Sequence, residues 1–159
     1  MSFWSNFFKK NSDLTSDSGL SNGLGELVMN WNRENIKLNS GISHDAIKQF
    51  QVEFDFSFEE DLFVEYLLKI NGFVDFEWDK NLFSFWSIDR MREENIDRYH
   101  SSDAIWFCDH SINLCSFGFG KTDNKIYTEY QTIGAFQPVA NSFKEFISLY
   151  LKDSYLLLR

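Results

Sequence analysis

The sequence has few cysteines, one proline and no long apolar run. Its two cysteines, Cys108 and Cys115, are too few for a disulfide framework, so we expect a reduced, cytoplasmic setting. No segment approaches the roughly 20 consecutive apolar residues that cross a bilayer. Residues 1–10 also lack the basic start and continuous apolar stretch of a signal peptide, and we expect no membrane association.

Positive charge is scarce as well. The 159 residues include 24 Asp and Glu against 15 Lys and Arg, for a net charge of −9. Such a chain repels phosphate backbones, which argues against nucleic acid as its main partner. Nine of the acids lie between Glu53 and Asp79 with a single base, Lys69, so this acidic window carries a charge of −8.

The acidic window has two interpretations. It is either a solvated surface, as charge runs usually are, or a landing site for a basic protein. Under the second interpretation, the residues that we expect to contact the partner are Glu59, Glu60, Asp61, Asp75, Glu77 and Asp79.

The chain length fits one domain with a short extension. Aromatic residues make up 18% of the sequence, which is ample material for one hydrophobic core. Near the start, an aromatic stripe at residues 3–8 precedes a Ser/Asn/Asp/Gly tract at residues 11–23 that is typical of a linker. We therefore expect residues 1–23 to be an extension and residues 24–159 to form a single domain.

The first half of the domain has helical periodicity. Apolar spacing predicts a helix over residues 24–34, and Ser43 is placed to cap a second helix. Ser57 and Glu60 have the spacing of a capping box, which predicts that a third helix begins there. That helix is expected to end at residues 71–72, Asn-Gly, because both residue types tolerate the left-handed conformation of a helix C-cap.

The second half has mainly strand periodicity. Apolar residues at 74, 76 and 78 alternate with Asp75 and Glu77, which predicts a strand with one solvated face. A capping box from Ser142 to Glu145 predicts a closing helix. The remaining expected elements are strands at 82–86, 104–109, 114–119 and 125–130, an edge strand at 137–139 and a short helix at 87–97.

Helices first, then strands joined by short turns, then a closing helix indicate an α+β fold. We expect an antiparallel or mixed sheet of about five to six strands with about four to five helices packed on it.

Catalytic motifs are missing. The sequence has no phosphate-binding loop, nucleophile elbow or His-Glu-x-x-His metal motif. A hairpin could bring Cys108 and Cys115 together with His110, but zinc sites usually need four ligands at tighter paired spacing. We expect buried core cysteines instead, with no metal and no cofactor. A small hydrolase that uses Asp109 and His110, or a pair of carboxylates, stays open as an alternative.

The order of these motifs resembles the SUKH superfamily, which includes bacterial toxin-immunity proteins and a yeast regulator of cell-wall synthesis. The likeness covers roughly residues 24–153. Members show a helix that ends in Phe, an Asn-Gly helix end, a Phe-x-Asp strand and an Ala-x-Ser-Phe-x-x-Phe closing helix. The matching positions are Phe50, Asn71, Gly72, Phe107, Asp109, Ala140, Ser142, Phe143 and Phe146. The chain departs from the family in having Ser57-Phe58 where Leu-Pro is usual.

The resemblance implies an α+β fold and a binding role without catalysis or a cofactor. In bacterial members, the partner is typically a polymorphic toxin, often a nuclease. The acidic window fits a basic nuclease, because an inhibitor can mimic the charge of nucleic acid. The leading hypothesis is an immunity protein that neutralises such a toxin by stoichiometric binding. The alternative is an intracellular adaptor or regulatory binding module without a toxin partner.

Overall fold

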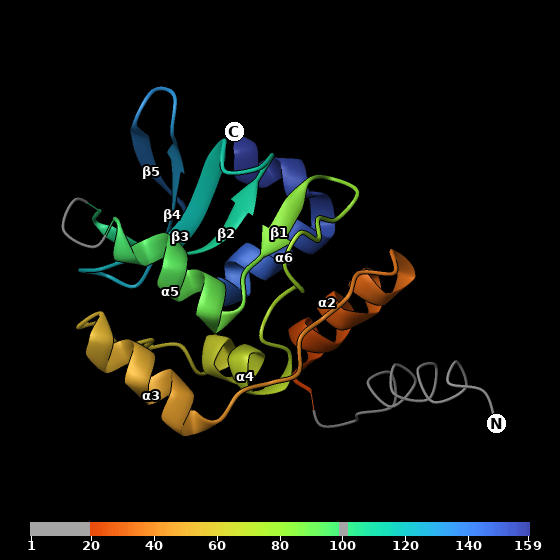
Figure 1. The fold of residues 1–159 in the computed structure, drawn as a ribbon. Coiled ribbons are helices and arrows are strands. Elements are labelled where there is room, and N and C mark those ends of the chain that lie inside the picture. Colours follow the sequence, from red (N-terminus) through yellow and green to blue (C-terminus); the bar gives the residue numbers. More distant parts are fainter. Residues whose placement is uncertain (1–19, 99–101) are drawn as a thin grey trace.

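The computed structural model describes residues 20–98 and 102–159. The aromatic stripe at residues 3–8 and most of the expected linker lie outside this part. Within it, α-helices come first and the strands follow (Figure 1). The elements are α2 (Asn22–Arg33), α3 (His44–Glu53), α4 (Asp61–Lys69), β1 (Phe83–Phe85), α5 (Ile88–Ile96), β2 (Ala104–His110), β3 (Cys115–Gly120), β4 (Ile126–Tyr130), β5 (Ala135–Ala140), α6 (Phe143–Asp153) and a 3-10 helix η1 (Ser154–Leu158).

The five strands form one antiparallel sheet in the order β1-β2-β3-β4-β5. From β2 to β5 this meander follows from the short turns between consecutive strands, whereas β1 and β2 are connected through α5. The predicted α+β class is therefore confirmed. β5 is an edge strand and contains Pro138, as expected, because an edge position tolerates the missing backbone donor.

Helices cover both faces of the sheet (Figure 1). On one face, the ring of Phe146 in α6 lies 5.3 Å from that of Phe107 in β2 and 5.4 Å from that of Phe117 in β3. On the other face, the guanidinium of Arg90 in α5 lies 3.9 Å from the carboxylate of Asp109 in β2 and 3.5 Å from the hydroxyl of Ser84 in β1. Most of the aromatic core lies on the α6 side of the sheet, together with α2 and α4.

Serine caps begin two of the helices as predicted. Ser43 accepts a hydrogen bond from the Ala46 N–H, and Ser142 accepts one from Glu145. The Glu145 carboxylate bonds to the Asn141 N–H, one residue before the expected position. The expected Asn-Gly end of α4 is also confirmed, since both residues 71 and 72 have positive φ.

The predicted capping box at Ser57 is wrong. Helix α4 begins only at Asp61, and its N-cap residue, Glu60, makes no capping bond with its side chain. The Phe58 N–H bonds to the side chain of Gln51, and the Phe58 ring is buried in the core, so the segment stays extended. The carboxylate of Glu60 bonds to another helix instead, as described below.

The predicted strand at residues 74–78 is also wrong. These residues form a loop in which Phe76 has φ +66° and an 85% exposed side chain. The chain turns because Asp79 accepts hydrogen bonds from the N–H groups of Asn81 and Phe83, at 2.8 and 2.9 Å. Asp and Asn favour such local turns over a continued ladder.

Candidate protein-binding surface

The acidic window is divided between two separate neighbourhoods. Glu59, Glu60 and Asp61 precede and begin α4, whereas Asp75 and Glu77 lie in the loop after that helix. Glu59 and Asp61 are exposed. The window therefore does not form the single patch that its sequence spacing indicated.

Glu60 has a structural task. Its two carboxylate oxygens accept hydrogen bonds from the N–H groups of Phe143 and Lys144, at 2.5 and 2.9 Å. These are the first two residues of α6, where a helix has free N–H groups and favours a negative charge. Glu60 thus caps a helix more than 80 positions away along the chain, and its carboxylate is engaged within the fold, contrary to the predicted role in partner contact.

Asp79 does not lie on the surface, contrary to the sequence prediction. It is 4% exposed and accepts a hydrogen bond from the hydroxyl of Tyr150. That hydroxyl accepts a bond from Trp31 at 2.9 Å. Burial raises the pKa of Asp79, and the hydrogen bonds that it accepts partly offset this. Asp79 therefore anchors the loop to α2 and α6 and is not available to a partner.

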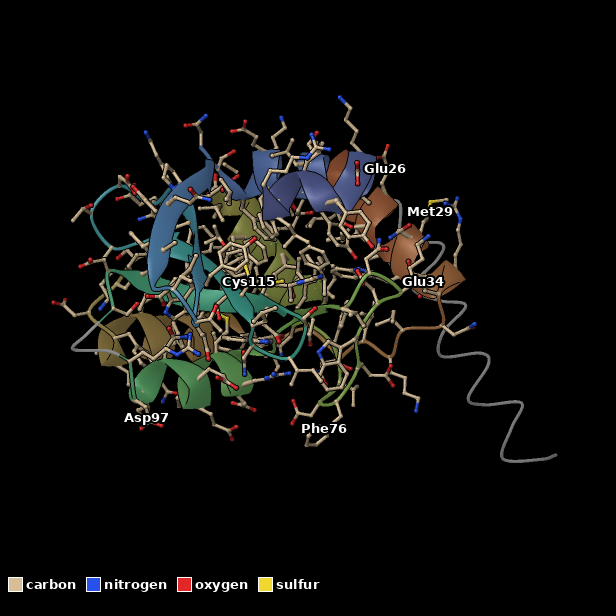
Figure 2. The ribbon with its side chains drawn as sticks, turned by 90° about the horizontal axis from the view of Figure 1, so that it is seen from above. Glu26, Met29, Glu34, Phe76, Asp97 and Cys115 are labelled. Carbon is tan, nitrogen blue, oxygen red and sulfur yellow. The ribbon has the colours of Figure 1, made fainter. Side chains whose placement is uncertain are left out.

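The loop of residues 74–78 presents the other acids. The side chain of Asp75 is exposed and that of Glu77 is half-buried, within 3.7 Å of the Lys37 ammonium. Between them lies Phe76, and Figure 2 shows it at the periphery of the molecule. An exposed Phe in the left-handed region is a true conformational outlier, costing on the order of 1–3 kcal/mol.

A second exposed apolar side chain lies beside this loop. Ile112, at the tip of the β2–β3 hairpin, is 74% exposed. Together the loop, the hairpin tip and α5 surround a depression of about 320 Å³. Its lining consists of Asp75, Phe76, Trp78, Arg90, Glu93, Glu94 and Ile112. We call this set the loop–hairpin surface.

The buried side chain of Asp109 holds the tip of the β2–β3 hairpin in place. Ser111, Ile112 and Asn113 all have positive φ, between 52° and 63°. The fully buried carboxylate of Asp109 accepts a bond from the Asn113 N–H at 2.7 Å. It also accepts one from the Trp86 indole at 2.9 Å and lies 3.9 Å from Arg90. Asp109 therefore fixes where Ile112 projects.

Asp109 and His110 are not arranged as a catalytic pair. As neighbours in β2, their side chains project from opposite faces of the sheet. The ring of His110 packs 4.9 Å from that of Phe83, and burial lowers its pKa. Asp109 and His110 therefore lack the proximity that acid–base chemistry between them would need.

The two cysteines are buried free thiols. In the sheet register, Cys115 lies opposite His110, whereas Cys108 lies opposite Phe117. Cys115 forms a 2.8 Å contact with the Thr128 hydroxyl, and burial raises the pKa of both thiols. Over residues 20–98 and 102–159, no three His, Cys, Asp or Glu side chains gather as metal ligands.

The sequence did not indicate that Phe76 and Ile112 would be exposed surface residues. Alternation around Phe76 indicated a buried strand face, although Asp79-Lys80-Asn81 directly afterwards is a turn signal. Ile112 lies in the polar turn expected between two strands, and an apolar residue at a hairpin tip has little core within reach. These were the available signals.

Residues 41–149 match the model of the SMI1 / KNR4 family (SUKH-1). This confirms the resemblance that the motifs indicated. The matched range includes all residues of the loop–hairpin surface. Helix α2 lies before the match but packs on α6 through the Trp31–Tyr150 bond. No curated protein matches the chain in sequence. Among the helices of the described part, none has the length and apolar character of a membrane span.

Proposed function

The chain belongs to the SMI1/KNR4 (SUKH-1) family, and we propose that it is an immunity protein that neutralises a bacterial toxin by stoichiometric binding, without catalysis. One observation carries the proposal: an exposed Phe76, held between Asp75 and Glu77, on a loop that the fold pins in place. An exposed aromatic side chain flanked by charged residues is typical of a protein-binding surface.

The charge favours a basic partner, such as a nuclease domain. A surface with one sign of charge accelerates encounter with the opposite sign, and this effect weakens as salt screens it. A nuclease binds the phosphate backbone with basic residues, and an acidic protein can occupy the same residues. The net charge of −9 and the acids of the loop–hairpin surface agree with this role.

Neutralisation in cells is the first test. A candidate toxin, the product of the gene next to that of this chain, is expressed alone and together with the chain, and survival is counted. Protection supports the proposal. If the chain binds a host protein but gives no protection, it is an adaptor instead.

The second test measures the association rate constant against ionic strength. Asp75→Lys should slow association with the purified toxin roughly 3–10-fold at low salt and less at high salt, because exposed charges act mainly on encounter. The matched control is Glu26→Lys, which makes the same charge change on α2; Figure 2 shows Glu26 on the opposite side of the molecule from Phe76. Equal rates for both variants would contradict a role for this surface.

A further inference from the structure

We propose that Phe76 and Ile112 form a two-pronged apolar anchor, and that the toxin receives it in an apolar pocket bordered by Lys and Arg. This rests on the proposed function and identifies the surface and the partner chemistry that carry it. The two prongs come from segments 36 positions apart in sequence and border one depression of about 320 Å³.

The first prong is preorganised. The N–H of Val74 bonds to the carbonyl of Lys37 at 2.8 Å, and that of Lys80 bonds to the Glu34 carboxylate at 2.8 Å. Asp79 fixes the end of the loop from within the core. Phe76 is thus held exposed in an unfavourable backbone conformation by contacts on both sides. Ordering such a loop before binding removes an entropy cost from association.

The second prong is fixed by independent contacts. The Ser111 N–H bonds to the carbonyl of Leu82 at 3.0 Å, which ties the hairpin tip to the chain beside β1. Asp109 holds the far side of the tip through Asn113. Ile112 therefore keeps its 74% exposure in a defined position. Two apolar side chains held in fixed positions can each fill a desolvated pocket of a partner, which is where binding energy concentrates.

The rim determines the partner's charge. Asp75, Glu93 and Glu94 line the depression. The one cation in this lining is Arg90, and its charge is neutralised by acidic side chains of the same chain. Its guanidinium lies 3.7 Å from Glu94 and 3.9 Å from Asp109, and it also covers the ring of Trp86 at 5.1 Å. The rim is therefore acidic around an apolar centre. The complementary surface is an apolar pocket with basic residues at its edge.

The test compares apolar prongs with a matched apolar control. Phe76→Ser and Ile112→Ser each remove one prong. Ile133→Ser makes the same change at the β4–β5 turn, where Ile133 is 73% exposed, almost equal to Ile112. The probe is the same candidate toxin, purified with its active site disabled, and association and dissociation rates are measured for each variant. Thermal unfolding verifies that all variants stay folded.

We expect Phe76→Ser and Ile112→Ser to raise the dissociation rate constant about 10–100-fold, with the association rate constant changed less than about threefold. Ile133→Ser should change neither rate by more than about twofold. Dissociation rates for the two prong variants equal to that of the control overturn the anchor and leave the proposed function standing. A wild-type chain that does not bind the toxin overturns both. A dimer of this chain that either prong variant disrupts would assign the anchor to a second copy and likewise overturn the inference.

Discussion

The bond from Glu60 to the start of α6 predicts a stability effect that sequence spacing would not indicate. Glu60→Ala removes the acceptor for two backbone N–H groups, at 2.5 and 2.9 Å, and removes a favourable charge at a helix N-terminus. Loss of a cap costs about 0.5–2 kcal/mol, and hydrogen bonds to a charged group contribute about 1.5–3 kcal/mol. Because Glu60 is half-buried, we expect a net loss of about 2 kcal/mol in the free energy of unfolding.

The assay is equilibrium unfolding in urea. The midpoint should fall while the slope m stays constant, because the mutation changes stability and not the surface exposed. For a chain of this size, a loss of about 2 kcal/mol lowers the melting temperature by roughly 4–8 °C. Glu60→Gln keeps an acceptor but not the charge, so it should lose about half as much.

The matched control is Glu59→Ala. Within the described residues, the Glu59 side chain makes no hydrogen bond or ion pair, and its removal should change stability by less than about 0.5 kcal/mol. If Glu60→Ala and Glu59→Ala unfold at the same urea concentration, the cap from α4 to α6 contributes nothing and our description of Glu60 is wrong.

Three further predictions concern the core. Phe146→Ala should lower the free energy of unfolding in urea by about 3–5 kcal/mol, because it opens a cavity in the core. Ser142→Ala should lower it by about 1 kcal/mol, because it removes one helix cap. A Phe146→Ala variant as stable as the wild type would show that α6 is not packed on the core. Burial raises the pKa of Asp79 in the folded state, so ionisation of this carboxyl group opposes folding. The wild-type chain therefore loses stability as pH rises from about 4 through the raised pKa. Asp79→Asn should therefore become more stable relative to wild type as pH increases; a difference that is constant with pH contradicts this. Cys108 and Cys115 should react slowly with a thiol reagent in the native chain and give two thiols on unfolding, whereas one zinc per chain on elemental analysis would contradict free thiols.

Local sequence signals predicted most of the fold. Helix α6 was foreseen because its cap and apolar stripe lie within a dozen residues of one another. The meander was foreseen because each of β2, β3 and β4 is separated from the next by a short turn. Such signals depend only on neighbours in the chain, and no distant contact overrides them here.

Signals that depend on distant contacts could not be predicted. The spacing of Ser57 and Glu60 matches a capping box, yet Gln51 and α6 take up the groups that would form it. Alternation around Phe76 matches a strand, yet the chain turns at Asp79, whose carboxylate is held in the core by Tyr150, 71 positions later. In the acidic window, only Asp75 and Glu77 lie beside the exposed Phe76, and the window's sequence does not distinguish them from Asp79 in the core.

The most direct test of the central claim is a titration of the toxin's activity with this chain. Stoichiometric binding predicts that, at toxin concentrations well above the dissociation constant, activity falls linearly and reaches zero at one chain per toxin. The end point should not depend on incubation time. Loss of activity at far less than one chain per toxin, and growing with time, would show catalysis and contradict the account; so would full activity at any excess of the chain.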